Sequence, residues 1–284
     1  MKTTIPKEIN VLRLLKKYEF NGGIKGFKLG WSVAGPPLMT VYCYLFGNVM
    51  IDTAQPHMAK EVVDIARENK IGQIFLTHHH EDHSGNAAVI QKKFGTKVFG
   101  HEQCIIKMKH GYPILPYQKY IWGKTTPLDI LPFSEKIETS LGTMIPIHTP
   151  GHSRDHTVFF LPEKGIIFSG DLYLGDRIRF FRADEDIGFQ IDSLKKVANL
   201  DFDTLLCAHN PREKNGKGHV RLKLEFLEEL YERVIALWKQ GLFEKEIFRK
   251  LRLKEDYFTK YFCFGNVSML NGVRSVIRHH ENRA

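Results

Sequence analysis

Runs of apolar residues predict a sheet near the start of the chain. Residues 24–31 and 39–53 are rich in aromatic and β-branched residues and are separated by Gly-Pro-Pro, which is typical of a hairpin-rich sheet. Apolar residues then recur at helical spacing over 56–66, and 71–76 resembles a buried strand. Ser84 is suited to cap a second helix. The pattern therefore predicts strands and helices in alternation after the first hairpin.

The middle of the chain repeats this arrangement. Short apolar runs at 144–149, 156–162 and 165–175 are separated by Pro and Gly and predict strands. The pattern at 187–200 predicts a helix, and the run at 203–208 predicts the strand after it. Two similar halves of mixed strands and helices indicate an α+β fold, in which two packed sheets carry helices on their outer faces.

The pattern changes in the last quarter of the chain. A polar, glycine-containing segment at 212–219 is followed by apolar residues at helical spacing over 227–238, which predict a long amphipathic helix with shorter helices after it. We therefore expect a large domain over 1–218 and a helical extension over 219–284. The apolar face of the extension is expected to cap the large domain or to pair two copies of the chain in a homodimer.

Composition places the chain among folded globular proteins. Of its 284 residues, 43% are hydrophobic and 12% are aromatic, which is enough to fill a sizeable core. No run of 18 apolar residues occurs, and the first twenty residues lack the apolar stretch of a secretory signal. Four cysteines lie far apart without paired spacing, which favours reduced thiols. We therefore expect a cytoplasmic protein that does not cross a membrane.

The net charge of +9 is concentrated near the end of the chain. Residues 212–284 hold 16 Lys and Arg against 10 Asp and Glu, so this segment carries +6 of the total. Such an excess favours anionic partners, but a basic face exposed to solvent is its commoner meaning. A small molecule is therefore the preferred partner, and nucleic acid is the alternative.

The densest polar cluster directly follows a predicted strand. In LTHHHEDHSGN, residues 76–86, four histidines and two acids occupy six consecutive positions. If the chain stays extended after the strand, His78 and His80 point to the same side, and Asp82 and His83 follow at the turn into the next helix. Imidazole and carboxylate groups are ligands for Zn²⁺ and, less selectively, for Fe or Mn.

Three single donors each follow another apolar strand. They are His152 in HTPGHS, Asp171 in FSGDLY and His209 in LCAHN. Taken alone, each has an ordinary interpretation as a turn residue or a buried core histidine. Seven donors that all end buried strands are more simply explained by one metal site.

These residues resemble the metallo-β-lactamase superfamily. Its HxHxDH signature is matched by residues 78–83, and TPGHS, SGD and AHN follow in the family's order within about residues 20–215. The last motif, CAHNP, departs from the more usual Gly-His pair. The resemblance implies a four-layer αββα sandwich with a dinuclear site at the sheet edges, holding two zinc ions or, alternatively, Fe or Mn.

The resemblance also assigns the donors to two ions. It implies His78, His80 and His152 on one ion, Asp82, His83 and His209 on the second, and Asp171 as the bridge. Two neighbouring residues, His79 and Glu81, occupy variable positions and are expected to point away from the ions. Asp52 matches the family's acidic residue near the site, where it either orients a ligand imidazole or only ends a strand.

The expected chemistry is hydrolysis. Two divalent cations that share a water lower its pKa to near neutrality, so the expected nucleophile is a metal-bound hydroxide. We expect Asp82 to orient the attacking oxygen and Tyr173, two residues after Asp171, to offer its hydroxyl to an oxyanion. The alternative for Tyr173 is a wall of the site. The chain is thus expected to be a metal-dependent hydrolase.

Three classes of reaction fit this sequence. The first is hydrolysis of a small acyl compound such as a thioester, ester or lactone, which a compact core without a large substrate-capturing domain favours. The second is phosphodiester cleavage, above all of RNA, which the basic extension favours. The third is di-iron redox chemistry, which ranks last because such relatives carry an electron-transfer domain. Residues 110–124, which hold several Tyr and Trp, are either a lid over the metals or an inert packed loop.

Overall fold

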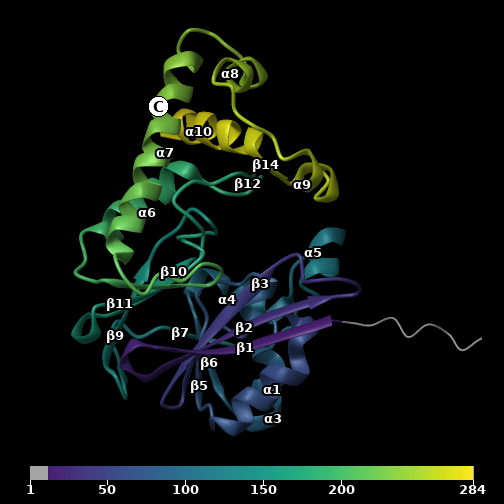
Figure 1. Cartoon of the computed structure of the whole chain (residues 1–284), viewed down its shortest axis with the longest axis vertical. Coiled ribbons are helices and arrows are strands. Elements are labelled where there is room, and N and C mark those ends of the chain that lie inside the picture. Colours follow the sequence, from purple (N-terminus) through teal and green to yellow (C-terminus); the bar gives the residue numbers. More distant parts are fainter. Residues whose placement is uncertain (1–11, 284) are drawn as a thin grey trace, which may run out of the picture.

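Two stacked β-sheets with helices on their outer faces form the body of the molecule, and a helical region stands at one end (Figure 1). The computed structural model describes residues 12–283. The first sheet has seven strands in sequential order, β1 (Leu12–Phe20), β2 (Ile24–Ser32), β3 (Thr40–Phe46), β4 (Val49–Ile51), β5 (Gln73–Phe75), β6 (Lys97–Gly100) and β7 (Leu131–Pro132). Neighbours are antiparallel up to β4 and parallel from β4 to β7.

The second sheet has five strands in the order β13-β11-β10-β9-β8. Their bounds are β8 (Ile137–Thr139), β9 (Gly142–His148), β10 (Thr157–Leu161), β11 (Ile166–Gly170) and β13 (Thr204–Cys207). Neighbours are antiparallel except β11 and β13, which run parallel. A separate two-stranded ribbon pairs β12 (Phe181–Arg182) with β14 (Val267–Ser268).

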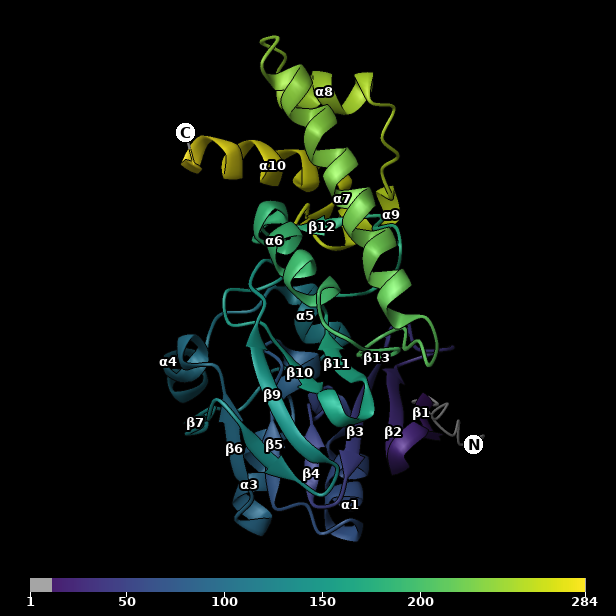
Figure 2. The same cartoon turned by 90° about the vertical axis from the view of Figure 1, so that its left-hand side faces the viewer.

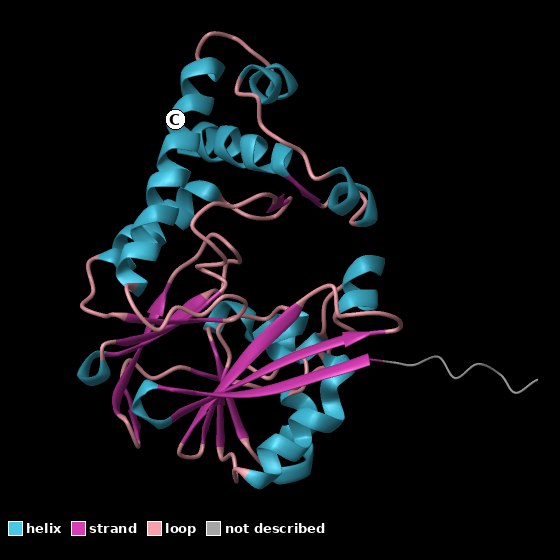
Figure 3. Ribbon diagram, viewed as in Figure 1, coloured by secondary structure: helices cyan, strands magenta, loops and turns pink. Residues whose placement is uncertain are grey.

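The helices divide into two groups by position. The helices in the first half of the chain are α1 (Ala59–Glu68), α2 (Glu81–Ser84), α3 (Ala87–Phe94), α4 (Glu102–His110) and α5 (Pro116–Ile121). The rest are α6 (Ile187–Ala198), α7 (Gly216–Trp238), α8 (Glu244–Lys250), α9 (Tyr257–Phe262) and α10 (Met269–Arg283). Figure 3 shows α7 to α10 gathered beyond one end of the two sheets.

Alternation along the strands explains the layers. In β3, Tyr42 and Tyr44 face the core between the two sheets, whereas Val41 and Cys43 face the core under α1, α3 and α4. Likewise, alternate residues of β10 belong to the core between the sheets and to the core under α6. Because neighbouring residues of a strand point to opposite faces, two apolar sets per strand require cover on both sides. The predicted α+β fold with an αββα sandwich is confirmed.

The helical region shares its core with the second sheet. One apolar cluster contains Leu205 and Cys207 of β13 together with Val220, Leu227 and Val273 of α7 and α10. The ribbon of β12 and β14 adds a backbone connection between residues 181–182 and 267–268. Figure 2 shows α7 rising from the sheets beside α6. The described part of this region, residues 219–283, therefore shares its core with the second sheet, and the long helix α7 begins at Gly216, near the predicted boundary.

Two local features differ from the sequence pattern. The strand β1 has no marked hydrophobic period, because most of its side chains are exposed and it forms the edge of the sheet. Ser84 does not cap a helix: it ends the short α2, and its hydroxyl donates to the carbonyls of His79 and His80. Such back-bonding competes with the capping role of a serine.

None of the helices within residues 12–283 has the length and apolar character needed to span a bilayer.

Candidate metal centre

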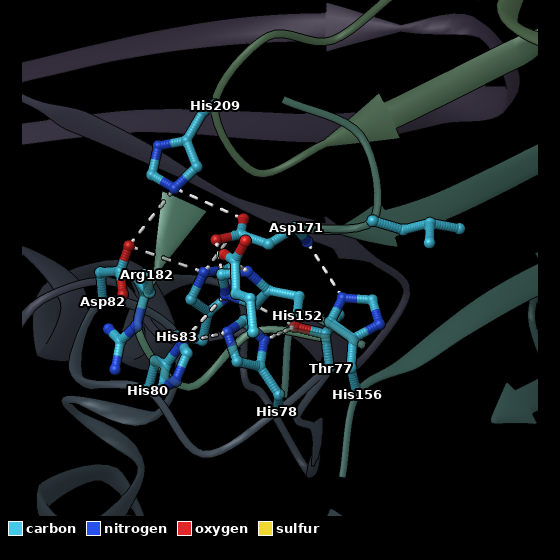
Figure 4. Close-up of polar contacts among 12 residues, drawn as sticks. Thr77, His78, His80, Asp82, His83, His152, His156, Asp171, Arg182 and His209 are labelled. Carbon is cyan, nitrogen blue, oxygen red and sulfur yellow. Dashed lines mark hydrogen bonds and ion pairs between the residues drawn. The ribbon is translucent and has the colours of Figure 1, made fainter. Parts of the chain in front are cut away.

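The seven predicted donors meet at one edge of the two sheets (Figure 4). They come from the loop after β5, from α2, from the β9–β10 loop, and from the residues that follow β11 and β13. Within each of two groups the donor atoms all lie within 4.8 Å of one another. These groups are His78, His80 and His152, and Asp82, His83, Asp171 and His209.

Three imidazoles make the first group. His78 Nε2 lies 2.9 Å from His80 Nδ1, and His152 Nε2 lies 3.1 Å from the same atom. Donors that share a tetrahedral zinc ion at its usual bond length are about 3.4 Å apart. Burial, followed by the neighbouring imidazole of His83, lowers the pKa of His78 well below its ordinary value. The pKa of His80 is also well below its ordinary value, first because of burial. These two rings are therefore neutral and keep lone pairs available for a cation.

The second group combines two imidazoles and two carboxylates. Asp82 Oδ2 lies 3.3 Å from His209 Nε2 and 3.6 Å from His83 Nε2. Asp171 Oδ1 lies 3.4 Å from the Nε2 atoms of both histidines. Burial opposes the charged form of His83, but Asp82 and Asp171 outweigh it and raise the pKa of His83 well above its ordinary value. The same carboxylates raise the pKa of His209.

Asp171 lies between the two groups. Its Oδ1 faces His83 and His209, and its Oδ2 is 3.3 Å from His152 Nε2 in the first group. One carboxylate thus offers one oxygen to each group. This is the arrangement that a ligand bridging two metal ions requires.

The far nitrogens of three donor imidazoles are held by acceptors. His83 Nδ1 is 2.8 Å from Asp52 Oδ2, His152 Nδ1 is 2.8 Å from Glu185 Oε1, and His209 Nδ1 is 2.7 Å from the carbonyl of Thr40. When Nδ1 carries the proton, Nε2 keeps its lone pair and the ring orientation is fixed. In all three residues Nε2 is the atom that faces the other donors.

Asp52 occupies the position expected for an orienting carboxylate. Besides His83, it accepts hydrogen bonds from the backbone N–H and the hydroxyl of Thr77, each at 2.8 Å. Its backbone has a positive φ of 57°, which is uncommon for an aspartate. This geometry supports the orienting role over a simple strand end, because one carboxylate links the loop before the histidines to a donor ring.

Close packing sets the position of Asp171. Its backbone N–H donates to His156 Nε2 at 3.0 Å. The preceding Gly170 has a φ of +47°, and a Cβ there would lie 2.8 Å from His156 Nε2 and 2.9 Å from Thr77 Oγ1. Only glycine fits this backbone without displacing both neighbours. The SGD motif therefore positions a carboxylate as well as supplying it.

The donor set fits two divalent cations. His83 Nε2 and Asp171 Oδ1 are buried and have no hydrogen-bond partner among residues 12–283. Unpaired buried polar atoms of this kind are costly, and an ion between the donors would satisfy them. Mixed nitrogen and oxygen donors suit zinc as well as iron or manganese.

The two intervening residues point away from this centre. His79 Nδ1 is 2.7 Å from Asp155 Oδ1, and its backbone N–H donates to the same carboxylate. The carboxylate of Glu81 accepts from Gln118 Nε2 at 3.2 Å. Burial, reinforced by Asp82, raises the pKa of Glu81 to about 7. Both residues belong to the packing around the site.

The structure argues against the predicted catalytic role of Tyr173. Its hydroxyl donates to Asp176 at 2.7 Å and also lies 3.4 Å from the Nε of Arg212. Its ring is fully buried in the core under α6 and does not line the cavity beside the donors. After Asp171 the chain turns, and two residues are enough to carry a side chain away from the centre.

A cavity of about 520 Å³ opens beside the donors. Its floor is formed by five donors, His80, Asp82, His152, Asp171 and His209. Its walls include Tyr117 and Trp122 from the segment 110–124 and Phe258 and Phe262 from α9. Only Tyr117, Ile121 and Trp122 of the segment 110–124, which lie in or directly after the helix α5, therefore belong to the wall of the site. The helical region supplies the opposite wall.

Four residues near the centre were not singled out by the sequence pattern. They are Asp155, His156, Arg182 and Glu185. The first two lie within four residues of His152, so the density of polar residues in GHSRDH was an available signal. The other two are Arg182, in the two-residue strand β12, and Glu185, in the loop after it, and this stretch carries no recognisable motif. Only the folded chain brings that stretch to the donors.

Comparisons with known proteins agree with this geometry. A family model described as "Metallo-beta-lactamase superfamily" matches residues 36–209. The Beta-lactamase-like protein 2 homolog of Drosophila melanogaster is 26% identical over 221 residues, which cover 75% of this chain and 73% of that protein.

Two further relatives have names that state an activity. Thioesterase pkgB of Emericella nidulans is 29% identical over 180 residues, which cover 61% of this chain and 46% of that protein. Hydroxyacylglutathione hydrolase of Cereibacter sphaeroides is 26% identical over 174 residues, with coverage of 60% and 61%. The match therefore spans less than two thirds of each of these two relatives.

A solved structure shares the fold along nearly the whole chain. A metallo-beta-lactamase family protein from Thermus thermophilus superposes with a TM-score of 0.64 and 21% identity, covering 95% of this chain and 94% of that one. A metallo-beta-lactamase from Erythrobacter litoralis has a TM-score of 0.58 and 18% identity and covers 78% of this chain. The fold is therefore shared, and the family model covers more than half of the sequence. The chain belongs to the metallo-β-lactamase superfamily.

Proposed function

We propose that this protein is a dinuclear metal-dependent hydrolase, with zinc as the expected metal, that cleaves small acyl thioesters. The observation that carries the proposal is the cavity of about 520 Å³ that has five of the seven donors as its floor. Cavities of this size suit a small molecule, and largely apolar walls suit an acyl group. A polymer such as RNA requires instead an open groove that follows its backbone.

The side chains of the centre have separable tasks. Two bound divalent ions supply Lewis-acid stabilisation and a water of lowered pKa. Asp82, on the cavity floor, is placed to orient the attacking oxygen and to accept its proton. Asp52, Glu185 and the carbonyl of Thr40 hold three imidazoles in one orientation. Aromatic walls exclude bulk water, which strengthens the electrostatic interactions inside.

The names of the relatives support a thioester over an ester or lactone. One is called a thioesterase, and another is a hydroxyacylglutathione hydrolase. A thioester also has a good leaving group, so hydrolysis requires no dedicated side-chain acid.

The proposal is tested by assaying the zinc-loaded protein with an acyl thioester, a lactone and single-stranded RNA side by side. We expect the thioester to be hydrolysed fastest. Because His80 is in the donor set, the rate should fall at least about 100-fold in His80→Ala. The matched control is His110→Ala, since His110 is exposed at the end of α4. If RNA is the only compound cleaved, and this cleavage is lost in His80→Ala, the proposed thioesterase function is wrong and the protein is a ribonuclease.

A further inference from the structure

Arg182 lines the cavity without belonging to either donor group. It lies on β12, opposite Val267 of β14, so the ribbon between the two parts of the molecule sets its position. Its side chain is 21% exposed. In the view of Figure 4 its guanidinium lies next to His80 and Asp82. The positive charge of Arg182 is therefore held near the place where the reaction occurs.

The hydrogen-bonding capacity of Arg182 is only partly used. Its Nε and Nη2 donate to Asp184 at 3.1 and 3.3 Å. The Asp184 side chain is 58% exposed, so water already solvates it in part. Among residues 12–283, no group accepts a hydrogen bond from Nη1. A guanidinium has five N–H donors and binds a carboxylate through two of them at once.

The other charged groups in the buried part of the cavity wall are already engaged. Asp82 and Asp171 belong to the donor set, and Glu185 accepts from His152 and from Gln190. Lys223 is buried and donates to the carbonyl of Leu172. Arg182 is thus the charged side chain of the cavity wall with unused donors close to the centre.

The low exposure of Arg182 also indicates which part of a thioester it is placed to contact, the acyl part or the leaving thiol. Two further arginines of the same segment, Arg177 and Arg179, line the cavity but are exposed, and the side chain of Arg179 is 79% exposed. A leaving thiol must depart through the open side of the cavity. The less exposed Arg182 is therefore better placed for the acyl part.

We infer that Arg182 is a specificity residue that binds a carboxylate on the acyl part of the substrate, so that this enzyme prefers acyl thioesters with an anionic group near the scissile carbonyl. This inference rests on the proposed thioesterase function. A bidentate contact explains why an arginine, rather than a lysine, stands at this position. The alternative is that Arg182 only balances the charge of its neighbour Asp184.

Three thioesters separate these possibilities in the zinc-loaded protein. They are succinyl and butanoyl thioesters of N-acetylcysteamine and the butanoyl thioester of 3-mercaptopropionate. The first has a carboxylate on the acyl part, the second has none, and the third has it on the thiol. We expect the wild-type kcat/KM for the succinyl compound to exceed that for its butanoyl counterpart by about 10- to 100-fold, since a charge-assisted contact is lost otherwise.

The ratio of kcat/KM for the succinyl compound to kcat/KM for its butanoyl counterpart should fall by about 10- to 100-fold in Arg182→Met and by less in Arg182→Lys. Arg233→Met is the matched control, because Arg233 pairs with Glu229 on the exposed face of α7, and its ratio should equal that of the wild type. Bound metal and Tm are measured for each variant. If the methionine variant does not fold, the lysine variant gives the same comparison.

The outcomes are distinguishable. If all three compounds are hydrolysed and the succinyl-to-butanoyl ratio of kcat/KM is the same in wild type and Arg182→Met, the role of Arg182 is overturned but the proposed thioesterase function is not. A loss confined to the thiol-carboxylate compound would overturn its assignment to the acyl part. Hydrolysis of none of the three would overturn the proposed function together with this inference.

Discussion

At the scale of single residues, the centre depends on which nitrogen of each imidazole holds a proton. Three acceptors fix Nδ1 of His83, His152 and His209, and leave Nε2 toward the donors. Asp82 and Asp171 raise the pKa of His83 and His209, so protons compete with metal ions for the same Nε2 atoms. Metal binding must displace those protons.

The first prediction concerns pH. In the metal-free protein, pairing with carboxylates raises the pKa of His83 and His209. This pairing stabilises the fold fully at pH values below the unfolded pKa of about 6.5. The stabilisation is lost as the pH rises through the folded pKa. Zinc affinity should change in the opposite direction. We expect it to rise with pH by about tenfold per pH unit for each proton displaced.

This is measured by titrating metal-free protein with zinc at pH 6, 7 and 8 and by recording proton release in weakly buffered solution. Binding that releases no protons and has the same affinity at all three values would contradict the assigned protonation. Zinc binding to the unfolded chain is excluded by checking that each sample is folded before the titration.

The second prediction concerns Glu185, which holds His152 at Nδ1. Replacing Glu185 by Gln removes the charge that fixes the ring, so zinc affinity should fall by about 10- to 100-fold. Competition with a chromogenic chelator measures it. The control is Glu229→Gln on the exposed face of α7. Equal zinc affinity in Glu185→Gln and the wild type would show that zinc binding does not depend on the charge of Glu185 beside His152.

At the scale of elements, short segments rather than long ones shape the site. The ribbon of β12 and β14 has two residues in each strand, yet it fixes the cavity wall between the sheets and α10. Gly272 of α10 allows this contact, since a Cβ there would lie 2.6 Å from Cδ2 of the buried Phe181. Overpacking of this kind forces neighbouring atoms to move.

The third prediction follows from that contact. Gly272→Ala should lower the free energy of unfolding by about 1–3 kcal/mol, despite the better helix propensity of alanine. Urea unfolding followed by circular dichroism measures the change. Glu281→Ala, on the exposed side of the same helix, should change stability by no more than about 0.5 kcal/mol. A stabilised Gly272→Ala would mean that the helix can shift freely from β12.

Long elements with a clear period were predictable, and short or exposed ones were not. The helix at 187–200 and the strands β9, β10, β11 and β13 of the second sheet follow from apolar spacing, whereas the three-residue β8 was not predicted. By contrast, β1 is exposed, and β12 and β14 exist only because residues 181–182 and 267–268 meet in the fold. Pairing between such distant short segments leaves no local signal.

At the scale of the whole molecule, distant segments become one site because their strands end at the same edge. The seven donors could be predicted because each follows an apolar run and matches a known motif. Glu185 and Arg182 could not be predicted, because the path of β12 and of the loop after it depends on the helical region. The incorrect expectation for Tyr173 has the same origin: proximity in sequence to Asp171 does not determine which way the chain turns.

The helical region completes the cavity at this scale. Without α9, the cavity would lose Phe258 and Phe262 from one wall, and the donors would face solvent on that side. Most of the basic residues of this region are exposed, on helices that pack on one another and, through α7, on the second sheet.

Two catalytic metal ions at the seven donors are tested most directly by measuring bound metal per chain alongside thioester hydrolysis. Metal-free protein is titrated with zinc, separated from free metal, and analysed by mass spectrometry for zinc and by rate. We expect saturation at two zinc ions per chain, with the rate rising as the sites fill and falling to background after chelation. Thioester hydrolysis that persists at full rate after complete metal removal, or a folded protein that binds no zinc, would contradict a catalytic dinuclear site.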